Sequence, residues 1–161
     1  MDVKFQLDYL KLLAAAEVSP KLTHQVMVLA LSKSAREVQM IARAKHRFRS
    51  RTTMLEKSVD YTVDETEMEA AIFLDETVAS YGPWIHDGTK PHWILPRAKK
   101  ALRWTQGGKF VFATKAWHPG TKKDQFLYEA GGAALPKINL IFARAVDDLT
   151  VQLDRQIGGG A

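Results

Sequence analysis

The sequence predicts an α+β fold in which two long helices pack against an antiparallel sheet. Two observations predict it: segments with helical periodicity lie toward the two ends of the chain, and segments with alternating periodicity lie together between them. The chain has 161 residues, of which 46% are hydrophobic and 25% are charged, as is typical of one soluble globular domain. We therefore expect a single domain over residues 1–157 and a flexible glycine-rich tail over residues 158–161.

The N-terminal third of the chain is predicted to be mainly helical. Residues 3–7 alternate weakly, as in a short strand, and residues 9–17 predict a helix with Leu10, Leu13 and Ala14 on one face. Ser19 and Pro20 are typical of an N-cap and a first helical position, so a second helix should run from there to about residue 46. Its apolar stripe consists of Val28, Leu31, Ala35, Val38 and Ala42.

The middle of the chain predicts strands. Residues 57–63 and 67–75 alternate between apolar and polar side chains and predict an antiparallel hairpin around the polar link 64–66. Residues 78–84 predict one turn of helix that leads into a loop. Three more short strands are expected over residues 92–95, 98–104 and 110–115, with a turn at residues 106–108.

The C-terminal part of the chain contains helix-breaking signals. Residues 124–130 predict a short helix that stops at Gly131 and Gly132. The last helix is expected to begin near Pro136 and to end before Gly158. Its buried stripe consists of Ile138, Phe142, Ala145, Leu149 and Leu153.

Charge is strongly segregated along the chain, although the net charge is only +5. Residues 61–89 carry seven acidic and no basic side chains, and residues 90–123 carry nine basic and no acidic ones. The basic block can neutralise the phosphates of a nucleic acid, or it can pair with the acidic block of a second copy. A third interpretation is that the two blocks neighbour each other within one chain. All three interpretations stay open at the level of the sequence.

A pentapeptide with the pattern His-x-Gly-Thr-Lys occurs twice. Each copy predicts a turn, because glycine permits a positive φ and threonine can bond back to the backbone. The order Gly-Thr-Lys does not match a phosphate-binding loop. We interpret both copies as candidate interface or docking loops. Their residues are His86, Asp87, Gly88, Thr89 and Lys90 in the first copy, and His118, Pro119, Gly120, Thr121 and Lys122 in the second.

Other features that can carry chemistry are few. The absence of cysteine excludes disulfides, thiolate metal sites and cysteine nucleophiles. His86, His92 and His118 could gather around zinc, but loop hydrogen bonds explain them more simply. The acidic run at residues 64–69 lacks a calcium-loop pattern and fits a solvated hairpin edge. We expect no catalytic residues, no metal and no cofactor.

Every second residue is basic in the segment that follows the long N-terminal helix. In an extended chain these side chains would point to one side and suit a phosphate backbone. Equally, the dipole of the helix favours cations at its C-terminus. The candidate DNA-facing or subunit-facing residues, including two from the basic block, are Lys45, Arg47, Arg49, Arg51, Lys99 and Lys100.

Three motifs follow one another along residues 20–147. They are RTTMLEKSV at residues 51–59, YGPWIHDGT at residues 81–89, and HPGT followed by QFL at residues 118–127. Together they resemble the tail-completion, or head–tail joining, family of tailed bacteriophages. The family's runs are Arg-Thr-Gly-x-Leu-x-x-Ser-Ile, Tyr-Ala-x-x-Val-Glu-x-Gly-Thr and His-Pro-Gly-Thr before Pro-Phe-Leu. Thr53 stands where the family has a glycine, and His86 stands where a glutamate is common.

The resemblance implies a structural virion protein of the phage neck, without catalytic residues. Such a subunit assembles with copies of itself into a ring, with six-fold symmetry, that joins the tail tube to the head connector or stopper. DNA passes through the centre of the ring. The implied location is the head-proximal end of the tail, after synthesis in the cytoplasm of the bacterial host, with no membrane partner. The alternative function is a small basic nucleic-acid-binding module, or a metal-free nuclease with His86 or His118 as base.

Overall fold

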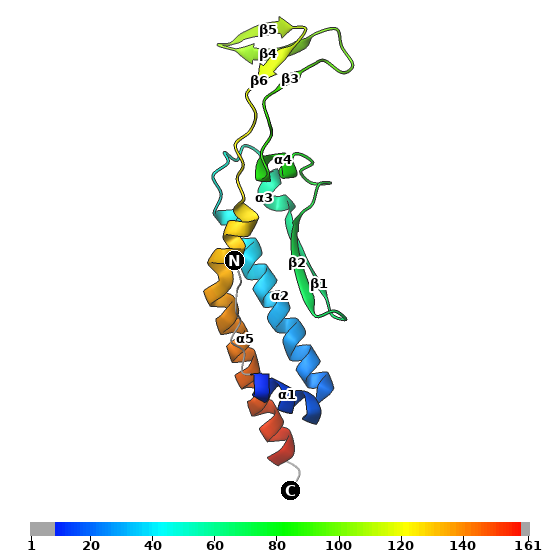
Figure 1. Cartoon of the computed structure of the whole chain (residues 1–161), viewed down its shortest axis with the longest axis vertical. Helices are drawn as coiled ribbons and strands as arrows, with labels where there is room; N and C mark the ends of the chain where they lie inside the picture. The colour runs from blue at the N-terminus through cyan, green and yellow to red at the C-terminus, as the bar shows by residue number, and fades with distance from the viewer. Residues whose placement is uncertain (1–8, 159–161) are drawn as a thin grey trace.

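The structure is a computed structural model that describes residues 9–158. It is elongated, with a helical body at one end and a small group of strands at the other (Figure 1). Two long helices that run in opposite directions, α2 (Pro20–Ala44) and α5 (Phe126–Gly158), form most of the body. The predicted combination of long helices and antiparallel strands is confirmed.

Helix α2 begins where its sequence predicts. Ser19 takes the N-cap position and Pro20 the first turn. The helix ends at Ala44, two residues earlier than predicted, because Lys45 adopts an extended backbone. All residues of the predicted stripe are buried or half-buried: Val28, Leu31, Ala35, Val38 and Ala42.

Helix α5 is continuous over 33 residues, so the predicted break at Gly131 and Gly132 is wrong. Pro136 lies inside this helix and not at its start. The helix-breaking tendencies of Gly131, Gly132 and Pro136 are outweighed because one buried face of the helix continues past them and packs against α2. Tertiary packing of this kind supplies most of a helix's stability. Helix α5 includes Gly158, and residues 159–161 of the predicted tail lie outside the described residues. The face is formed by Phe126, Ala130, Ala134, Ile138, Phe142, Ala145, Val146, Leu149 and Leu153.

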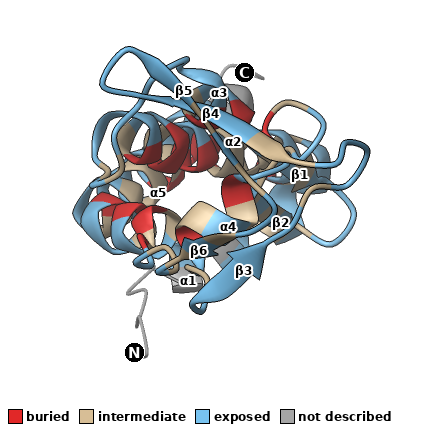
Figure 2. Cartoon of the chain, turned by 90° about the horizontal axis from the view of Figure 1, so that it is seen from above, coloured by how far each residue is buried: buried red, intermediate tan, exposed pale blue. Residues whose placement is uncertain are grey.

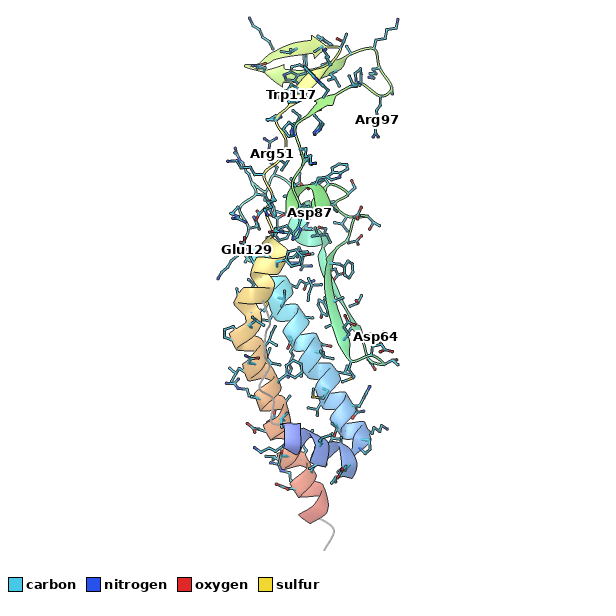
Figure 3. The ribbon with its side chains drawn as sticks, viewed as in Figure 1. Arg51, Asp64, Asp87, Arg97, Trp117 and Glu129 are labelled. Carbon is cyan, nitrogen blue, oxygen red and sulfur yellow. The ribbon has the colours of Figure 1, made fainter. Side chains whose placement is uncertain are left out.

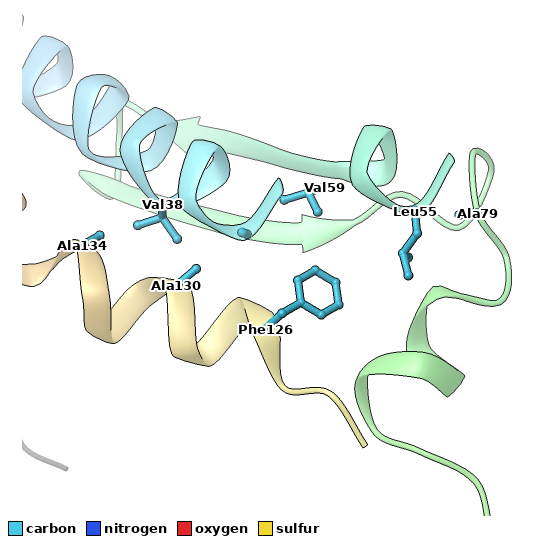
Figure 4. Close-up of a cluster of buried hydrophobic side chains, with 8 residues drawn as sticks. Val38, Leu55, Val59, Ala79, Phe126, Ala130 and Ala134 are labelled. Carbon is cyan, nitrogen blue, oxygen red and sulfur yellow. The ribbon is translucent and has the colours of Figure 1, made fainter. Parts of the chain in front are cut away.

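The main hydrophobic core lies between the C-terminal half of α2, the N-terminal half of α5 and the short helix α3 (Met54–Ser58) (Figure 4). Small side chains are prominent in it, because Ala42, Ala130 and Ala134 are all buried. They allow the two helix backbones to lie close together. Larger side chains fill the remaining space, and two of them, Phe126 and Val59, have no exposed surface. Seen along the long axis, the buried positions gather on the facing sides of α2 and α5 (Figure 2).

Helix α1 (Tyr9–Val18) closes the end of the body that lies far from the strands (Figure 1). Its predicted apolar face is wrong, because Leu13 and Ala14 are exposed and Ala15 is buried. Ala15 packs against the C-terminal part of α5 in a second, smaller core. The side chain of Leu10, and the strand predicted over residues 3–7, lie outside the part of the chain that the structure describes.

The predicted antiparallel hairpin is confirmed as β1 (Val59–Asp64) and β2 (Glu69–Leu74), in which Tyr61 lies opposite Ile72. Alternate residues face α2 and solvent, as the two-residue period of a strand requires. Strand β1 begins two residues later than predicted, because helix α3 takes up the residues before it. The predicted turn of helix after the hairpin is found slightly later, as α4 (Gly82–His86).

The remaining strands form two further two-stranded sheets, so the prediction of one sheet against both long helices is wrong. Strand β3 (His92–Ile94) pairs with β6 (Ala116–His118), and β4 (Leu102–Gln106) pairs with β5 (Lys109–Ala113). The predicted turn between the last two is confirmed, with Gly107 and Gly108 at positive φ. Strand β6 was not predicted, because its three residues are defined by pairing with a distant strand. We call residues 92–118 the head.

Replacing Gly132 by alanine is expected to raise the free energy of unfolding by about 0.5–1 kcal/mol, because alanine favours the helix interior. A Cβ at this position meets no atom within 4 Å. Chemical denaturation of the two proteins measures the difference. The matched control is Gly107→Ala, where the space is also open but φ is +57°, so alanine should destabilise. Loss of stability at Gly132 would contradict the continuous helix.

Candidate functional site: the neck and the basic head

Two chain segments, residues 87–91 and 119–125, connect the body to the head, and we call them the neck (Figure 1). The two copies of the pentapeptide repeat pair with each other here. The N–H of Thr89 donates to the carbonyl oxygen of Thr121 at 3.0 Å, and the N–H of Thr121 donates to that of Thr89 at 3.2 Å. The Thr121 N–H also reaches the Thr89 hydroxyl, at 2.9 Å. The structure thus brings together the two candidate docking loops and uses their pairing to hold the head.

The glycines of the two repeats are required by this pairing. Gly88 has a φ of 76° and Gly120 a φ of 90°, a region that other residues rarely adopt. A Cβ on Gly88 would lie 2.7 Å from the carbonyl oxygen of Thr121, and one on Gly120 would overlap with that of Thr89. Glycine therefore serves both the turn and the close approach of the two backbones.

The three histidines considered as zinc ligands do not meet. His92 and His118 lie opposite each other on β3 and β6, with ring centroids 5.1 Å apart, and His118 Nδ1 accepts the N–H of Gly120 at 3.1 Å. His86 is buried in the body, where its Nδ1 lies 2.8 Å from an oxygen of Asp87 and its ring contacts Phe126. Within residues 9–158, no three His, Asp or Glu side chains gather as metal ligands.

The basic segment after α2, residues 45–51, bends at residues 47–48 and alternates between exposed and half-buried side chains over residues 45–49. Lys45, Arg49 and Arg51 are exposed and make no ion pair with the described part of the chain (Figure 3). The intervening His46 and Phe48 are half-buried and stack on each other, with ring centroids 3.8 Å apart. These three residues are exposed as expected, while their display on one side stays a prediction.

Arg47 differs from its neighbours because Asp124 holds it. The buried Asp124 carboxylate accepts the N–H of Arg47 at 2.6 Å and that of Phe48 at 2.8 Å, and it lies 3.3 Å from Arg47 Nε. The guanidinium also pairs with Glu129 at 2.6 Å, so Arg47 serves the fold. The N–H of Asp124 donates to the carbonyl oxygen of Ile85, at 3.1 Å. Asp124 thereby joins the basic segment, α4 and the beginning of α5 at the base of the neck.

The sequence analysis missed Asp124 as an anchor. Its one local signal is that it follows an uninterrupted basic block and precedes the first turn of a helix. A carboxylate at that position is favoured by the N-terminal end of the helix dipole. Its backbone partners, however, lie 76 and 77 residues earlier in the chain.

A cavity of about 770 Å³ lies between the basic segment and the neck. Apolar side chains such as Leu55 and Ile85 line part of it, and Arg49, Arg51 and Lys122 are among its basic lining residues. Residues from all three motifs of the phage-family resemblance line this one cavity. Thr53 is also there and has a φ of 55°, a left-handed conformation at the position where the family has a glycine. An apolar surface with cationic side chains is suited to binding an acidic, partly apolar segment of another macromolecule.

The head is basic, aromatic and without a core of its own. It contains six basic and no acidic residues, and none of its residues is buried. Lys99 and Lys100 lie in its exposed loop between β3 and β4. Trp93 and Trp117 pack edge to face across β3 and β6, with centroids 5.1 Å apart, yet each is more than half exposed. Phe110 is more exposed still.

The acidic turn of the β1–β2 hairpin and the basic head lie apart within the chain. Asp64, at the turn of the β1–β2 hairpin, points away from the end of the molecule that carries Arg97 and Trp117 (Figure 3). No ion pair joins the two blocks in the part of the chain described. The interpretation that the two blocks neighbour each other within one chain therefore holds at the neck, where Thr89 of the acidic block pairs with Thr121 of the basic block, but not for the hairpin turn and the head.

Comparisons of this chain with protein-family models, with curated proteins and with solved structures find no match. Between residues 9 and 158, no helix is long and apolar enough to cross a membrane. The resemblance to the phage tail-completion family accordingly rests on the three motifs and on their position around the neck.

Replacing Asp124 by alanine is expected to lower the free energy of unfolding by about 2–3 kcal/mol, because it leaves the N–H groups of Arg47 and Phe48 without their acceptor. Equilibrium denaturation measures the loss. Asp148→Ala, at an exposed position of the same helix, is the control and should change stability by less than about 0.5 kcal/mol. Equal effects of the two substitutions would show that Asp124 is not an anchor.

Replacing Gly120 by alanine is expected to disrupt the neck more than Gly107→Ala disrupts the head. Both positions have a positive φ, but only the Cβ at Gly120 would overlap with a backbone atom. Backbone strain alone costs about 1–3 kcal/mol, and the steric overlap adds to it. Hydrogen exchange of the Thr89 and Thr121 amides reports the pairing directly. Unchanged protection of both amides in the Gly120 variant would refute this account of the repeat.

Proposed function

We propose that this chain is a structural protein of the neck of a phage particle, which completes the phage tail and joins it to the phage head. In this proposal it is a single-domain, ring-forming subunit, and six copies surround a central passage for DNA. Its partners are copies of itself, the tail tube and the head connector or stopper. It acts by binding and needs no catalytic residue, cofactor or membrane.

The observation that carries the proposal is that the head of this chain, residues 92–118, contains no buried residue. Trp93, Phe110 and Trp117 are 53%, 65% and 55% exposed, respectively. Aromatic side chains contribute to stability when they leave water, so a module that buries none of them lacks most of that contribution. Contiguous exposed apolar surface surrounded by polar residues is typical of a protein interaction site. We infer that the head is covered when the protein is assembled.

The placement of the three motifs supports the same conclusion. Residues 51–59, 81–89 and 118–127 are far apart in the sequence, but each contributes to the cavity below the neck. Loops positioned by a rigid scaffold are where binding residues usually concentrate. The two long helices provide such a scaffold, and the neck and cavity lie at its end.

A second candidate function, nucleic-acid binding, is favoured by the charge of the head. Its six cations and its exposed aromatic rings are the two features of surfaces that bind single strands by backbone neutralisation and stacking. The nuclease form of this alternative is not favoured. His86 is buried, and His118 uses Nδ1 to accept the Gly120 N–H.

Deleting the gene for this chain from its phage tests the proposal. We expect filled heads and complete tails that remain separate, because the joining ring is missing. Electron microscopy of lysates counts attached and separate particles, and expression of the chain from a plasmid should restore attachment. Particles that assemble with attached tails in the absence of the chain would refute the proposal.

A further inference from the structure

We propose that the head of one copy docks on the solvent-facing side of the β1–β2 hairpin of a neighbouring copy. This inference rests on the proposed self-assembly and names the two surfaces that meet. The charge, the apolar residues and the positions of these two surfaces support the proposed contact.

The head supplies an unneutralised cationic surface. No ion pair within the described residues involves any of its cations. Arg103 lies over the ring of Phe110 at 4.8 Å, and Lys115 lies over the ring of Trp93 at 4.7 Å, so a cation lies over an exposed aromatic ring in each of the two sheets of the head. The exposed loop between β3 and β4 adds Arg97, Lys99 and Lys100, which make no hydrogen bond, ion pair or ring contact within the described chain.

The hairpin supplies a surface of opposite charge. On its solvent-facing side, Phe73 and Ala71 form a small apolar strip, and Phe73 is 38% exposed. Acidic residues surround this strip, with Asp60 opposite Phe73 and with Asp64 opposite Glu69. The turn adds two more exposed carboxylates, from Glu65 and Glu67.

The acidic turn is rigid and keeps its charge. Oδ1 of Asp64 accepts the N–H of Glu67 at 3.0 Å and that of Thr66 at 2.8 Å. These hydrogen bonds hold the pKa of Asp64 below the usual aspartate value, and the one from the Glu67 N–H has the larger effect. The Asp64 carboxylate therefore stays ionised in more acidic solution than an ordinary aspartate would. Near neutral pH this negative charge is present together with the positive charges of lysine and arginine.

The two surfaces cannot satisfy each other within one chain, because the hairpin turn and the head point toward opposite ends of the molecule (Figure 3). Contact between copies removes this conflict. Since the two surfaces differ, each copy would offer a head to one neighbour and a hairpin to the next. Such a contact between two different surfaces generates a ring when the rotation between successive copies closes.

A second copy explains more of the surface than a nucleic acid does. A nucleic acid would neutralise the head but would be repelled by the acidic hairpin, which would keep Phe73 in water. Docking between copies covers the aromatic residues of the head and the apolar strip of the hairpin in the same contact. It also pairs both charge blocks at once.

Two charge-reversed variants and their mixture test the inference. The head variant carries Arg97→Glu, Lys99→Glu and Lys100→Glu, and the hairpin variant carries Glu65→Lys, Glu67→Lys and Glu69→Lys. We expect the wild-type protein to associate in about 10 mM salt and to dissociate in about 1 M salt, where charges are screened beyond about 3 Å. Each variant alone should associate about 100-fold more weakly. An equimolar mixture should associate again, because the reversed head of one variant complements the reversed hairpin of the other.

Analytical ultracentrifugation measures all of these states, and thermal unfolding checks that each variant is folded. A control with Lys21→Glu, Lys33→Glu and Arg36→Glu reverses three exposed charges on α2 and should associate like the wild type. Renewed association of the mixture is the result that the proposed pair of surfaces predicts. Mixing the α2 control variant with the hairpin variant shows how much association net charge alone produces.

Three outcomes would overturn the inference. One is a wild-type protein that stays monomeric up to about 1 mM, a concentration at which even weak complexes form. Another is variants that assemble normally, which would leave the proposed function intact but place the contact elsewhere. The third is a head variant that loses affinity for single-stranded or duplex DNA while its self-association is unchanged, which would assign the head to nucleic acid. Failure of the phage-neck function itself would instead appear as attached tails in the gene deletion.

Discussion

The burial of the Phe126 ring is the contact on which the arrangement of the body and the neck depends. Phe126 is the first residue of α5 and has no exposed surface. Its ring meets Phe48 of the basic segment at 5.3 Å and His86 of α4 at 5.6 Å, both edge to face. One aromatic side chain thus fixes the beginning of the longest helix against the basic segment and helix α4, which lie next to the neck. Burying a ring of this size contributes about 1.5–3 kcal/mol.

Asp124 provides the polar counterpart of this apolar contact, two residues earlier in the chain. A buried carboxylate is stable only when its hydrogen-bond partners are present, and here two backbone N–H groups and the Arg47 side chain supply them. Together the two residues hold the basic segment, α4 and the beginning of α5 against one another. The paired repeats then extend from these segments as a narrow connection, so the head can be held at a distance from the helices.

This division of the molecule gives its charge pattern a physical meaning. A long helical body with its own core carries an acidic hairpin along one side, while a head without a core carries cations and exposed aromatic rings. Surfaces of this kind gain free energy mainly by leaving water against a complementary partner. The proposed ring, and the proposed contact between head and hairpin, use both surfaces.

The sequence by itself determined the features that depend on neighbours in the chain. These are the apolar stripe of α2, the alternation of the β1–β2 hairpin, the Gly107–Gly108 turn and the need for glycine in the repeats. The tertiary structure alone decided the features that depend on distant partners. Helix α5 runs through Gly131, Gly132 and Pro136 because its buried face gains more from packing on α2 than these residues lose in local propensity. In the same way, β6, the pairing of the repeats and the anchoring by Asp124 each require a partner at least 22 residues away, which periodicity within a short window does not reveal.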